Sequence, residues 1–317
     1  MFDFGSVIAF GVEHMMIKCL NPGCFASDPG TNTGSVIRAG FFFRRSSYRK
    51  IQRFRCKRCG RSFSQATASA CFGQHKREVN LPLWRLLGSG VSMRRSAKLV
   101  GIHQNTVARK LAFLGAQARE DQKKFLIKLT QGGRVKLSTV QFDEMETFEH
   151  TKCKPLSLAL AVNKSRHILG IEVSSMPAKG LLSAIARRKY GPRADEREDG
   201  LGKLFKTILP LTTADVELRS DQCPRYPGLV KKYYPHAAHH TTKGGRGCSI
   251  GQGELKKLRF DPLFALNHTA AMIRANVNRL FRRTWCTTKK PQALYDHLSI
   301  YVSYHNRNLI KSLPKVA

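Results

Sequence analysis

The amino-acid sequence predicts an α+β protein that is built from more than one domain. Three observations support this prediction: two pairs of closely spaced cysteines near the N-terminus, three short helix-like stretches after them, and strand-like runs interleaved with helices in the remainder. At 317 residues the chain is long enough for one domain of ordinary size and one or two small modules.

The charge of the chain favours a polyanionic partner. The 55 Lys and Arg against 21 Asp and Glu give a formal net charge of +34, which far exceeds what solubility requires. Nucleic acid is the first candidate, and a membrane surface is the alternative. We expect no membrane association, because the sequence has neither an apolar run of the about 18 residues that a spanning helix needs nor an isolated basic amphipathic helix at one end.

The nine cysteines are typical of cytosolic thiols, because the chain is large, the count is odd and no signal peptide opens it. We therefore expect a cytoplasmic protein. Residues 1–16 are apolar and short, and we interpret them as an ordinary or disordered extension; translation from Met15 or Met16 is an alternative.

Two cysteine pairs predict a zinc ribbon within residues 1–74. Cys19 and Cys24 form the first pair, and Cys56 and Cys59 form the second. Each pair can turn two thiolates toward one tetrahedral Zn²⁺ ion, whose binding would supply much of the folding free energy of so small a module. The alternative is that these residues are buried free cysteines.

The segment between the cysteine pairs is basic and aromatic. Arginines and lysines alternate there with Phe41, Phe42, Phe43 and Tyr48. A hairpin of this composition either lies along phosphates or forms a solvated basic edge.

Residues 75–117 have the pattern of a helix-turn-helix. The predicted helices are 78–87, 92–100 and 103–114, with Gly101 in the turn, and 118–134 suits a linker helix. The apolar positions of the second and third helices form a shared inner face. The residues that this leaves outward, and that could contact DNA in a major groove, are Gln104, Asn105, Thr106, Arg109 and Lys110. A purely structural helical pair would look similar.

Two acidic residues follow strand-like runs in the remaining chain, residues 135–317. The run 135–143 ends on Asp143, and the run 214–221 ends on Asp221. If the two strands are neighbours in one sheet, these carboxylates converge and can bind a divalent cation, Mg²⁺ or Mn²⁺. Glu144 should point to the opposite face of the strand.

Further strands and helices complete the predicted core. Strands over 155–162 and 167–174 form an antiparallel meander with the first strand, and helices are predicted over 181–189, 203–209 and 291–305 and after Pro262. A meander, a helix and a further strand are compatible with the ribonuclease H-like fold. The helix after Pro262 leads into a basic edge that could contact DNA and that includes Arg274, Arg279, Arg282 and Arg283.

The order of these features resembles the DDE transposases of bacterial insertion sequences, which are ribonuclease H-like enzymes related in fold to retroviral integrases. The run from Asn267 to Lys289 is similar to the segment that follows the third catalytic residue in that family, as are Asp221 with Tyr226 and the later His239 and His240. The resemblance covers nearly all of the chain from Cys19 to Asn306. It also implies a bacterial, nucleoid-associated protein that acts on double-stranded DNA as a homodimer or higher oligomer.

The resemblance assigns the third metal ligand to Asn267, where relatives carry Glu. An amide oxygen can ligate Mg²⁺ but neutralises none of its charge. Glu254 and Asp261 are the alternative acids. His239 and His240 either approach the scissile phosphate or belong to a polar loop.

The chemistry that suits this set of ligands is two-metal phosphodiester transfer, with Asp143, Asp221 and Asn267 as catalytic metal ligands. The expected function is a transposase that binds terminal inverted repeats and then cuts and joins DNA. Two alternatives remain open: a catalytically inactive regulator derived from such an enzyme, and a structure-selective nuclease. We expect no cysteine nucleophile, because no cysteine outside the two pairs lies at a sequence spacing that would pair it with a specific base.

Overall fold

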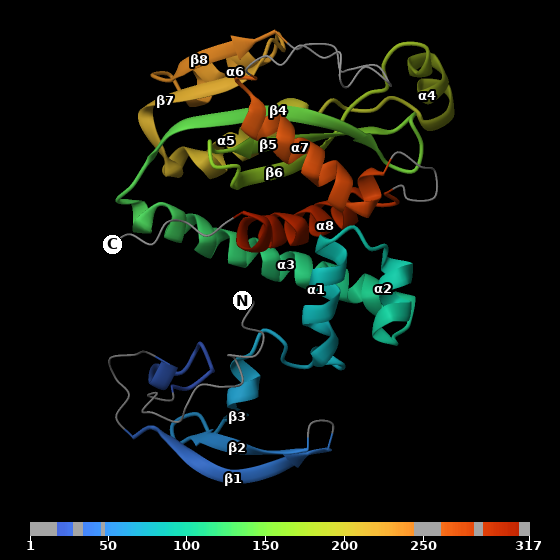
Figure 1. Cartoon of the computed structure of the whole chain (residues 1–317). Helices are drawn as coiled ribbons and strands as arrows, with labels where there is room; N and C mark the ends of the chain where they lie inside the picture. Colours follow the sequence, from blue (N-terminus) through green and yellow to red (C-terminus); the bar gives the residue numbers. More distant parts are fainter. Residues whose placement is uncertain (1–17, 28–33, 46–47, 244–260, 282–287, 311–317) are drawn as a thin grey trace. The chain divides into compact units, whose positions relative to one another are not determined.

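The computed structural model describes residues 18–27, 34–45, 48–243, 261–281 and 288–310. The chain divides into two compact units, which we call the N-terminal unit (Met1–Leu81) and the C-terminal unit (Pro82–Ala317). Strands and helices are both present, which confirms the predicted α+β class (Figure 1). None of the helices in the described ranges is long and apolar enough to cross a membrane.

The N-terminal unit contains a three-stranded antiparallel sheet. Its strands lie in the order β1 (Val36–Arg44), β2 (Arg49–Cys56) and β3 (Ser62–Ser64), with the short helical turns η1 (Phe25–Ser27), η4 (Gln65–Ala68) and η5 (Arg77–Val79) beside them in the chain. Phe54 and Phe63 are a cross-strand pair on β2 and β3, and their ring centroids are 5.9 Å apart. Both rings are buried and provide part of the small core of this unit.

Helices α1 (Asn80–Gly88), α2 (Met93–Val100) and α3 (Gln104–Leu129) follow. The Ser92 hydroxyl accepts a hydrogen bond from the N–H of Arg95 and caps the start of α2. Gly101 ends α2 with a left-handed backbone (φ 69°), which makes the turn into α3. The predicted helix-turn-helix pattern of 92–114 is therefore present as two helices joined at this turn.

The structure corrects the prediction of a separate linker helix, because α3 continues without a break through Gly115 to Leu129. Gly115 lies inside the helix where α3 packs against helix α8 (Pro291–Tyr304). A Cβ atom at this position would come within 2.6 Å of the Cβ atom of Asp296. The glycine thus marks a close approach of two helices and not the end of one.

The C-terminal unit is organised around a mixed five-stranded sheet in the order β6-β5-β4-β7-β8. Strands β4 (Leu137–Phe148), β5 (Pro155–Val162) and β6 (Ile168–Ser175) form the predicted antiparallel meander. Strand β7 (Thr212–Asp221) pairs with β4 in parallel, and β8 (Ala238–Thr242) pairs with β7 in parallel.

Helices cover both faces of this sheet (Figure 1). The apolar side chains of β4, β5 and β6 alternate between two cores, one on each face. One core joins β5 and β6 to α7 (Phe264–Asn276), η8 (Asn278–Leu280) and α8. The other joins β4, β5 and β7 to α5 (Arg197–Ile208), α6 (Tyr226–Tyr233) and the end of α3. In β4, Val140 and Phe142 belong to the α6 side, and Met145 belongs to the α7 side.

Some element boundaries differ from the prediction. Strand β4 does not end at Asp143 but continues to Phe148, because residues 143–148 keep pairing with β5. Helix α5 begins at Arg197, six residues before the start of the helix predicted over 203–209, because Leu201, Leu204 and Ile208 recur at helical spacing and are buried. The remaining helices are α4 (Leu182–Tyr190), the short turns η6 (Gln131–Gly133) and η7 (Leu209–Leu211), and the short π-helix η10 (His305–Leu309), which follows α8.

Candidate functional site

The four predicted zinc ligands lie together in the N-terminal unit. The sulfur atoms of Cys19, Cys24, Cys56 and Cys59 are all within 4.8 Å of one another, and we call this group the cysteine cluster. The Sγ atoms of Cys19 and Cys59 are 3.6 Å apart, and those of Cys24 and Cys56 are 3.9 Å apart. Four sulfurs at 2.3 Å from a tetrahedral Zn²⁺ ion would be about 3.8 Å apart. The cluster therefore fits one metal ion.

Backbone hydrogen bonds hold both halves of the cysteine cluster. The N–H of Cys19 donates to the carbonyl of Ala26, and the N–H of Cys24 donates to the carbonyl of Asn21, so this pair lies on a tight loop. Cys56 is the last residue of β2, and Cys59 lies in the turn before β3. Sheet and loop thus position the two pairs opposite each other.

The thiols of the cluster differ in electrostatic environment. Burial raises the pKa of Cys19 to about 12, whereas a backbone hydrogen bond from Arg61 lowers the pKa of Cys59 to about 6. Metal binding requires thiolates, and a positive ion would offset the desolvation that keeps Cys19 protonated. The buried thiol of Cys19 is therefore the one that a bound cation would stabilise most in its thiolate form.

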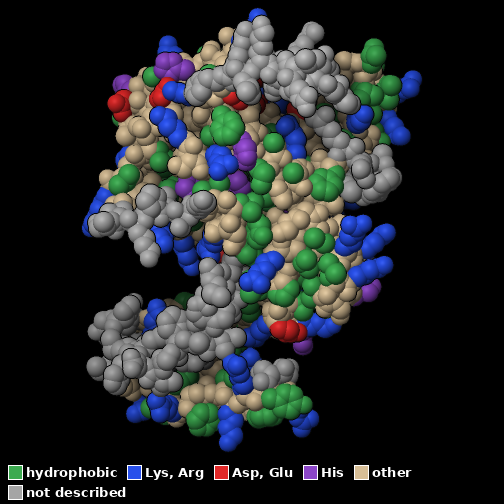
Figure 2. Space-filling view, viewed as in Figure 1, with side chains coloured by type: hydrophobic (Ala, Val, Ile, Leu, Met, Phe, Trp, Pro, Cys, Tyr) green, Lys and Arg blue, Asp and Glu red, His purple; other side chains and the backbone are tan. Residues whose placement is uncertain are grey.

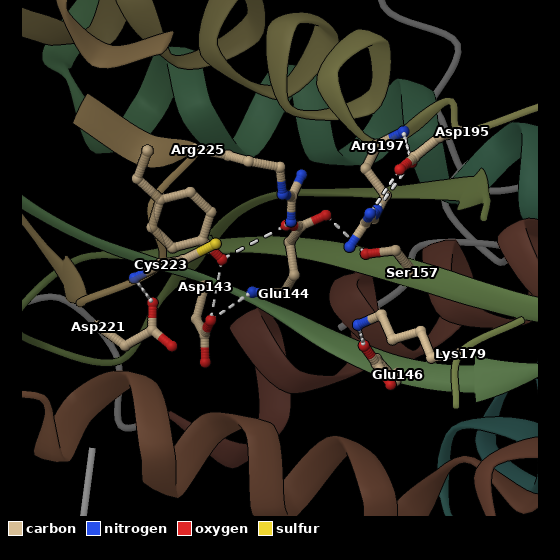
Figure 3. A network of polar contacts seen from close by, with 11 residues as sticks. Asp143, Glu144, Glu146, Ser157, Lys179, Asp195, Arg197, Asp221, Cys223 and Arg225 are labelled. Carbon is tan, nitrogen blue, oxygen red and sulfur yellow. Dashed lines mark hydrogen bonds and ion pairs between the residues drawn. The ribbon is translucent and has the colours of Figure 1, made fainter. Parts of the chain in front are cut away.

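Asp143 and Asp221 come from neighbouring parallel strands. The last parallel pair between β4 and β7 is Gln141 with Arg219, and two residues further along each strand stand Asp143 and Asp221. Figure 3 shows the two carboxylate groups facing the same space. Burial raises the pKa of Asp143 to about 6, and the negative charge of Asp221 contributes to that increase. The predicted convergence of these two acids is present, although Asp143 lies within its strand.

Hydrogen bonds fix the orientation of both acids. The Oδ1 atom of Asp143 accepts from the N–H of Glu144 (2.7 Å) and from the hydroxyl of Tyr226 (3.1 Å), and Asp221 accepts from the N–H of Cys223 (3.1 Å). Each contact involves Oδ1, so the second carboxylate oxygen of each acid remains directed toward the shared space (Figure 3). Tyr226, which belongs with Asp221 to the resemblance described above, lies on α6, and its buried ring positions its hydroxyl.

Glu144 lies on the α6 side of the sheet, as strand alternation predicts. Its carboxylate forms an ion pair with Arg225 and accepts a hydrogen bond from the Ser157 hydroxyl (2.7 Å). The Glu144 side chain is only 7% exposed. Arg225 balances its charge, and both partners donate hydrogen bonds to its carboxylate oxygens. It is therefore committed to a structural ion pair on the far side of β4 from the two acids.

The side chain of Gln141 ties the start of α7 to the same strand. Its Nε2 atom donates to the carbonyl of Pro262 (3.0 Å), and its Oε1 atom accepts from the N–H of Leu266 (2.9 Å). Gln141 precedes Asp143 by two residues and shares its face of β4. The first turn of α7, in which Asn267 lies, is thereby fixed at the end of the sheet that carries the acids.

Asn267 is exposed on α7, and its amide group donates to the carboxylate of Asp261 (2.9 Å). The other oxygen of Asp261 accepts from the N–H of Leu263. Among the described residues, no hydrogen bond joins either side chain to Asp143 or Asp221, and the cysteine cluster is the one group of three or more potential His, Cys, Asp or Glu ligands. Glu254 lies outside the described residues.

Helix α3 carries all five residues of the helix-turn-helix that were predicted to contact DNA. Gln104, Asn105 and Arg109 are exposed and Thr106 is half-buried, in line with the prediction. Lys110 corrects it, because this side chain is only 6% exposed. It follows Val107 by three residues and precedes Leu114 by four, and both are buried, so Lys110 lies on the inner face of α3.

The predicted basic edge after α7 is present in part. Arg274 is exposed, and it lines a pocket of about 490 Å³ together with Arg279 and with residues 145–148 of β4. Arg279 is half-buried, and its guanidinium contacts the sulfur of Met93 on α2. Arg282 and Arg283 lie outside the described residues.

Sequence reasoning missed α6 and strand β8. His239 and His240 lie in β8, where His239 stacks on Phe142 and contacts the hydroxyl of Ser220, with Nε2 2.9 Å from Oγ. Phe142 faces α6, so His239 lies on the side of the sheet away from the acids. The run Ala-His-His-Thr-Thr is short and polar, and its β-branched threonines were the one available strand signal.

Comparison with known proteins gives no identification: no family model matches the chain, and no curated protein matches it.

Proposed function

We propose that this protein is a DNA transposase that binds transposon ends and carries out metal-dependent cleavage and strand transfer. The observation that carries the proposal is the register of β4 against β7, which brings Asp143 and Asp221 to one end of the sheet in a strongly basic protein. The antiparallel meander, the helix α5 and the parallel strand β7 beside β4 agree with a ribonuclease H-like core.

The acids are suited to hard divalent cations. Asp143 and Asp221 offer carboxylate oxygens, and the raised pKa of Asp143 reflects a half-buried site with excess negative charge that a cation would balance. Asn267 or Asp261 would supply the third ligand from the start of α7. When bound, two such ions activate the attacking oxygen and stabilise the leaving oxygen of an in-line phosphodiester displacement.

The surrounding side chains position this site. Tyr226 and the N–H of Glu144 hold one oxygen of Asp143, and the N–H of Cys223 holds one oxygen of Asp221. Gln141 fixes the start of α7 against β4, and the third ligand would come from this first turn. We assign Tyr226 and Gln141 to positioning, because neither would touch the reacting phosphate.

DNA binding would be divided between two regions. The cysteine cluster would hold a structural Zn²⁺ ion, and the N-terminal unit would then present its basic sheet to phosphates. The exposed start of α3, with Gln104, Asn105 and Arg109, would contact a major groove. Arg274 would contact the DNA strand near the acids, and we expect two or more copies of the chain to act together on DNA.

The test is cleavage of DNA that contains the inverted repeats flanking the gene, with Mg²⁺ or Mn²⁺. Asp143→Asn and Asp221→Asn should each lower the cleavage rate by on the order of 10³-fold, about 4 kcal/mol in the barrier. Asp215→Asn, at an exposed acid of β7, is the matched control and should leave the rate unchanged. Cleavage that survives the Asp143 and Asp221 substitutions would refute the catalytic assignment.

One observation favours a non-catalytic alternative, a DNA-binding regulator. Asn267 is neutral, and its amide group is engaged with Asp261. If this pair does not supply a ligand, the site has two acids and holds metal weakly. Wild-type protein that binds the repeats but cleaves in neither metal would support the regulator. Asn267→Glu would then be expected to create activity.

A further inference from the structure

Three aromatic side chains that are more than half exposed distinguish the hairpin formed by β1 and β2. Phe41 is 64% exposed, Phe43 is 53% exposed and Tyr48 is 86% exposed. The rings of Phe43 and Tyr48 contact each other edge to face, with centroids 6.3 Å apart. Single exposed rings are common on protein surfaces, but a group of three on one small hairpin indicates a binding partner.

A β-bulge sets the direction of these rings. The register between the strands shifts by one residue between Arg38 and Phe41, and Gly40 has a left-handed backbone there (φ 73°). Beyond the bulge, Phe41 pairs with Gln52 and Phe43 pairs with Lys50. Phe41 and Phe43 therefore share one face of the hairpin, about 7 Å apart along the strand.

The charge around the rings has a single sign. No Asp or Glu occurs between Asp28 and Glu78, whereas Lys50 lies directly opposite Phe43 and Arg45 follows β1. The opposite face carries the exposed arginines Arg49, Arg53 and Arg55. In the described part of the chain, none of the ion pairs involves these three arginines. Figure 2 shows basic and hydrophobic side chains interspersed where β1 and β2 lie.

Rings flanked by cations match the chemistry of an unpaired nucleic-acid strand. Aromatic side chains stack on the flat faces of bases, and these faces are accessible only where a strand is unpaired. A spacing of about 7 Å between two rings is about twice the stacking distance of bases, 3.4 Å, and so leaves room for one base between them. Double-stranded DNA would engage the arginines through its phosphates but would leave the rings without a partner.

We propose that the hairpin face with Phe41, Phe43 and Tyr48 binds the bases of an unpaired DNA strand, while Lys50 and Arg45 contact its phosphates. Arg49, Arg53 and Arg55 on the other face bind the phosphates of the adjoining duplex. The substrate class is DNA with a single-stranded segment next to a duplex. This inference rests on the proposed function only in taking DNA as the nucleic acid, and it requires no catalysis.

A membrane surface also combines cations with aromatic side chains, but the arrangement of the hairpin argues against it. A segment that inserts into a membrane gathers its apolar side chains on one side. Here Phe42, which pairs with Ile51, lies on the opposite face from Phe41 and Phe43, among the arginines. Aromatic side chains on both faces suit a partner that wraps the hairpin.

The experiment compares two variants of the full-length protein by fluorescence anisotropy, with magnesium omitted and no chelator present. The ring variant is Phe41→Leu, Phe43→Leu, Tyr48→Leu, and the arginine variant is Arg53→Gln, Arg55→Gln. The probes are a labelled oligothymidylate, a blunt duplex and a duplex with a single-stranded tail. Cobalt(II) absorbance of the cysteine cluster shows whether each variant is folded.

For each base that it no longer stacks, the ring variant should lose about 10-fold in affinity for the oligothymidylate and for the tailed duplex. It should bind the blunt duplex with the same affinity as the wild-type protein. The slope of log affinity against log salt should not change. The arginine variant should weaken binding to both duplex probes and lower that slope by about 1 to 2.

Equal losses of the ring variant on all three probes, or no loss on any of them, would overturn the proposal. Ring-dependent pelleting with phosphatidylserine vesicles, without ring-dependent oligonucleotide binding, would overturn it in favour of a membrane. Because cleavage plays no part in these measurements, failure of the metal-dependent nicking test would leave this result intact, and the converse also holds.

Discussion

The N-terminal unit and the C-terminal unit are stabilised by different means. In the C-terminal unit, two apolar cores lie on the two faces of a five-stranded sheet. In the N-terminal unit, the buried apolar group around the cysteine cluster consists of Cys19, Cys24, Cys56 and Ala26, with the partly buried Val36. Small modules with so little core usually depend on a metal or a disulfide. The N-terminal unit should therefore require a metal ion to fold, whereas the C-terminal unit should not.

The largest expected effect is loss of the N-terminal fold when the metal site is broken. Structural Zn²⁺ sites contribute roughly 10 kcal/mol of binding free energy, which a unit of this size cannot replace. Cys56→Ser, or chelation of the metal, should therefore expose residues 36–64 to trypsin. Tryptophan fluorescence should not change, because both tryptophans, Trp84 and Trp285, belong to the C-terminal unit.

Cys153→Ser is the matched control for this experiment, because Cys153 is half-buried and lies outside the cysteine cluster. This variant should keep both the metal and the trypsin resistance of residues 36–64. Persistent protection of that segment in metal-free protein would show that the N-terminal unit folds by its apolar contacts alone.

Acid should act on the C-terminal unit through a buried histidine. His297 on α8 donates from Nε2 to the carbonyl of Leu87 (2.9 Å), and burial together with the positive charge of Arg279 lowers its pKa to about 4. The unfolded chain binds this proton near pH 6.5, so the free energy of unfolding should fall as pH decreases from 6.5 toward 4. The loss for this one group is about 3 kcal/mol across that range.

The measurement is urea unfolding followed by tryptophan fluorescence at several pH values. His297→Gln keeps a donor for the Leu87 carbonyl but removes the titrating ring. The slope of the free energy of unfolding against pH should therefore be smaller in this variant, by the equivalent of about one bound proton. His236→Gln, at an exposed position, is the control. The raised pKa of Asp143 changes the free energy of unfolding in the opposite direction. Below about pH 6 the folded state binds a proton at this acid more readily than the unfolded chain does, so this group stabilises the fold as pH decreases. An unchanged slope in His297→Gln would contradict the assignment.

The sequence predicted the N-terminal site better than the C-terminal one, for a physical reason. Cysteine spacing is local information, and each pair needs only a tight turn to present two sulfurs. The position of the acids depends on which strands become neighbours. The alternation around residues 135–143 and 214–221 predicted the two strands that carry Asp143 and Asp221, but their pairing entered only as a condition, which the structure meets. The alternation placed the end of β4 too early, because pairing with β5, a long-range effect, extends the strand to Phe148.

Other features of the C-terminal unit could not be predicted from local patterns. Lys110 was expected to be exposed because only apolar positions were assigned to the inner face, but its helical position beside Val107 and Leu114 places it on that face. The third metal ligand depends on how α7 meets the sheet, and the bonds from Gln141 that fix this contact join residues far apart in the chain. The continuous helix α3 was predicted as two helices because the chain after Leu114 becomes polar and charged, which is typical of a linker.

Gly115→Ala tests close packing within the C-terminal unit. Alanine favours a helix, so an isolated helix would become more stable by up to about 1 kcal/mol. Here the added Cβ would lie 2.6 Å from the Cβ atom of Asp296 and 2.8 Å from its Cα atom, and neither can move without shifting α8. Overpacking should therefore dominate and lower the free energy of unfolding by about 1 to 3 kcal/mol. Urea unfolding of Gly115→Ala, with the exposed Ala116→Ser as control, measures this effect. Because the contact belongs to the C-terminal unit, cobalt(II) binding by the cysteine cluster should be the same in both variants, and a stabilised Gly115→Ala protein would contradict the close packing of α3 and α8.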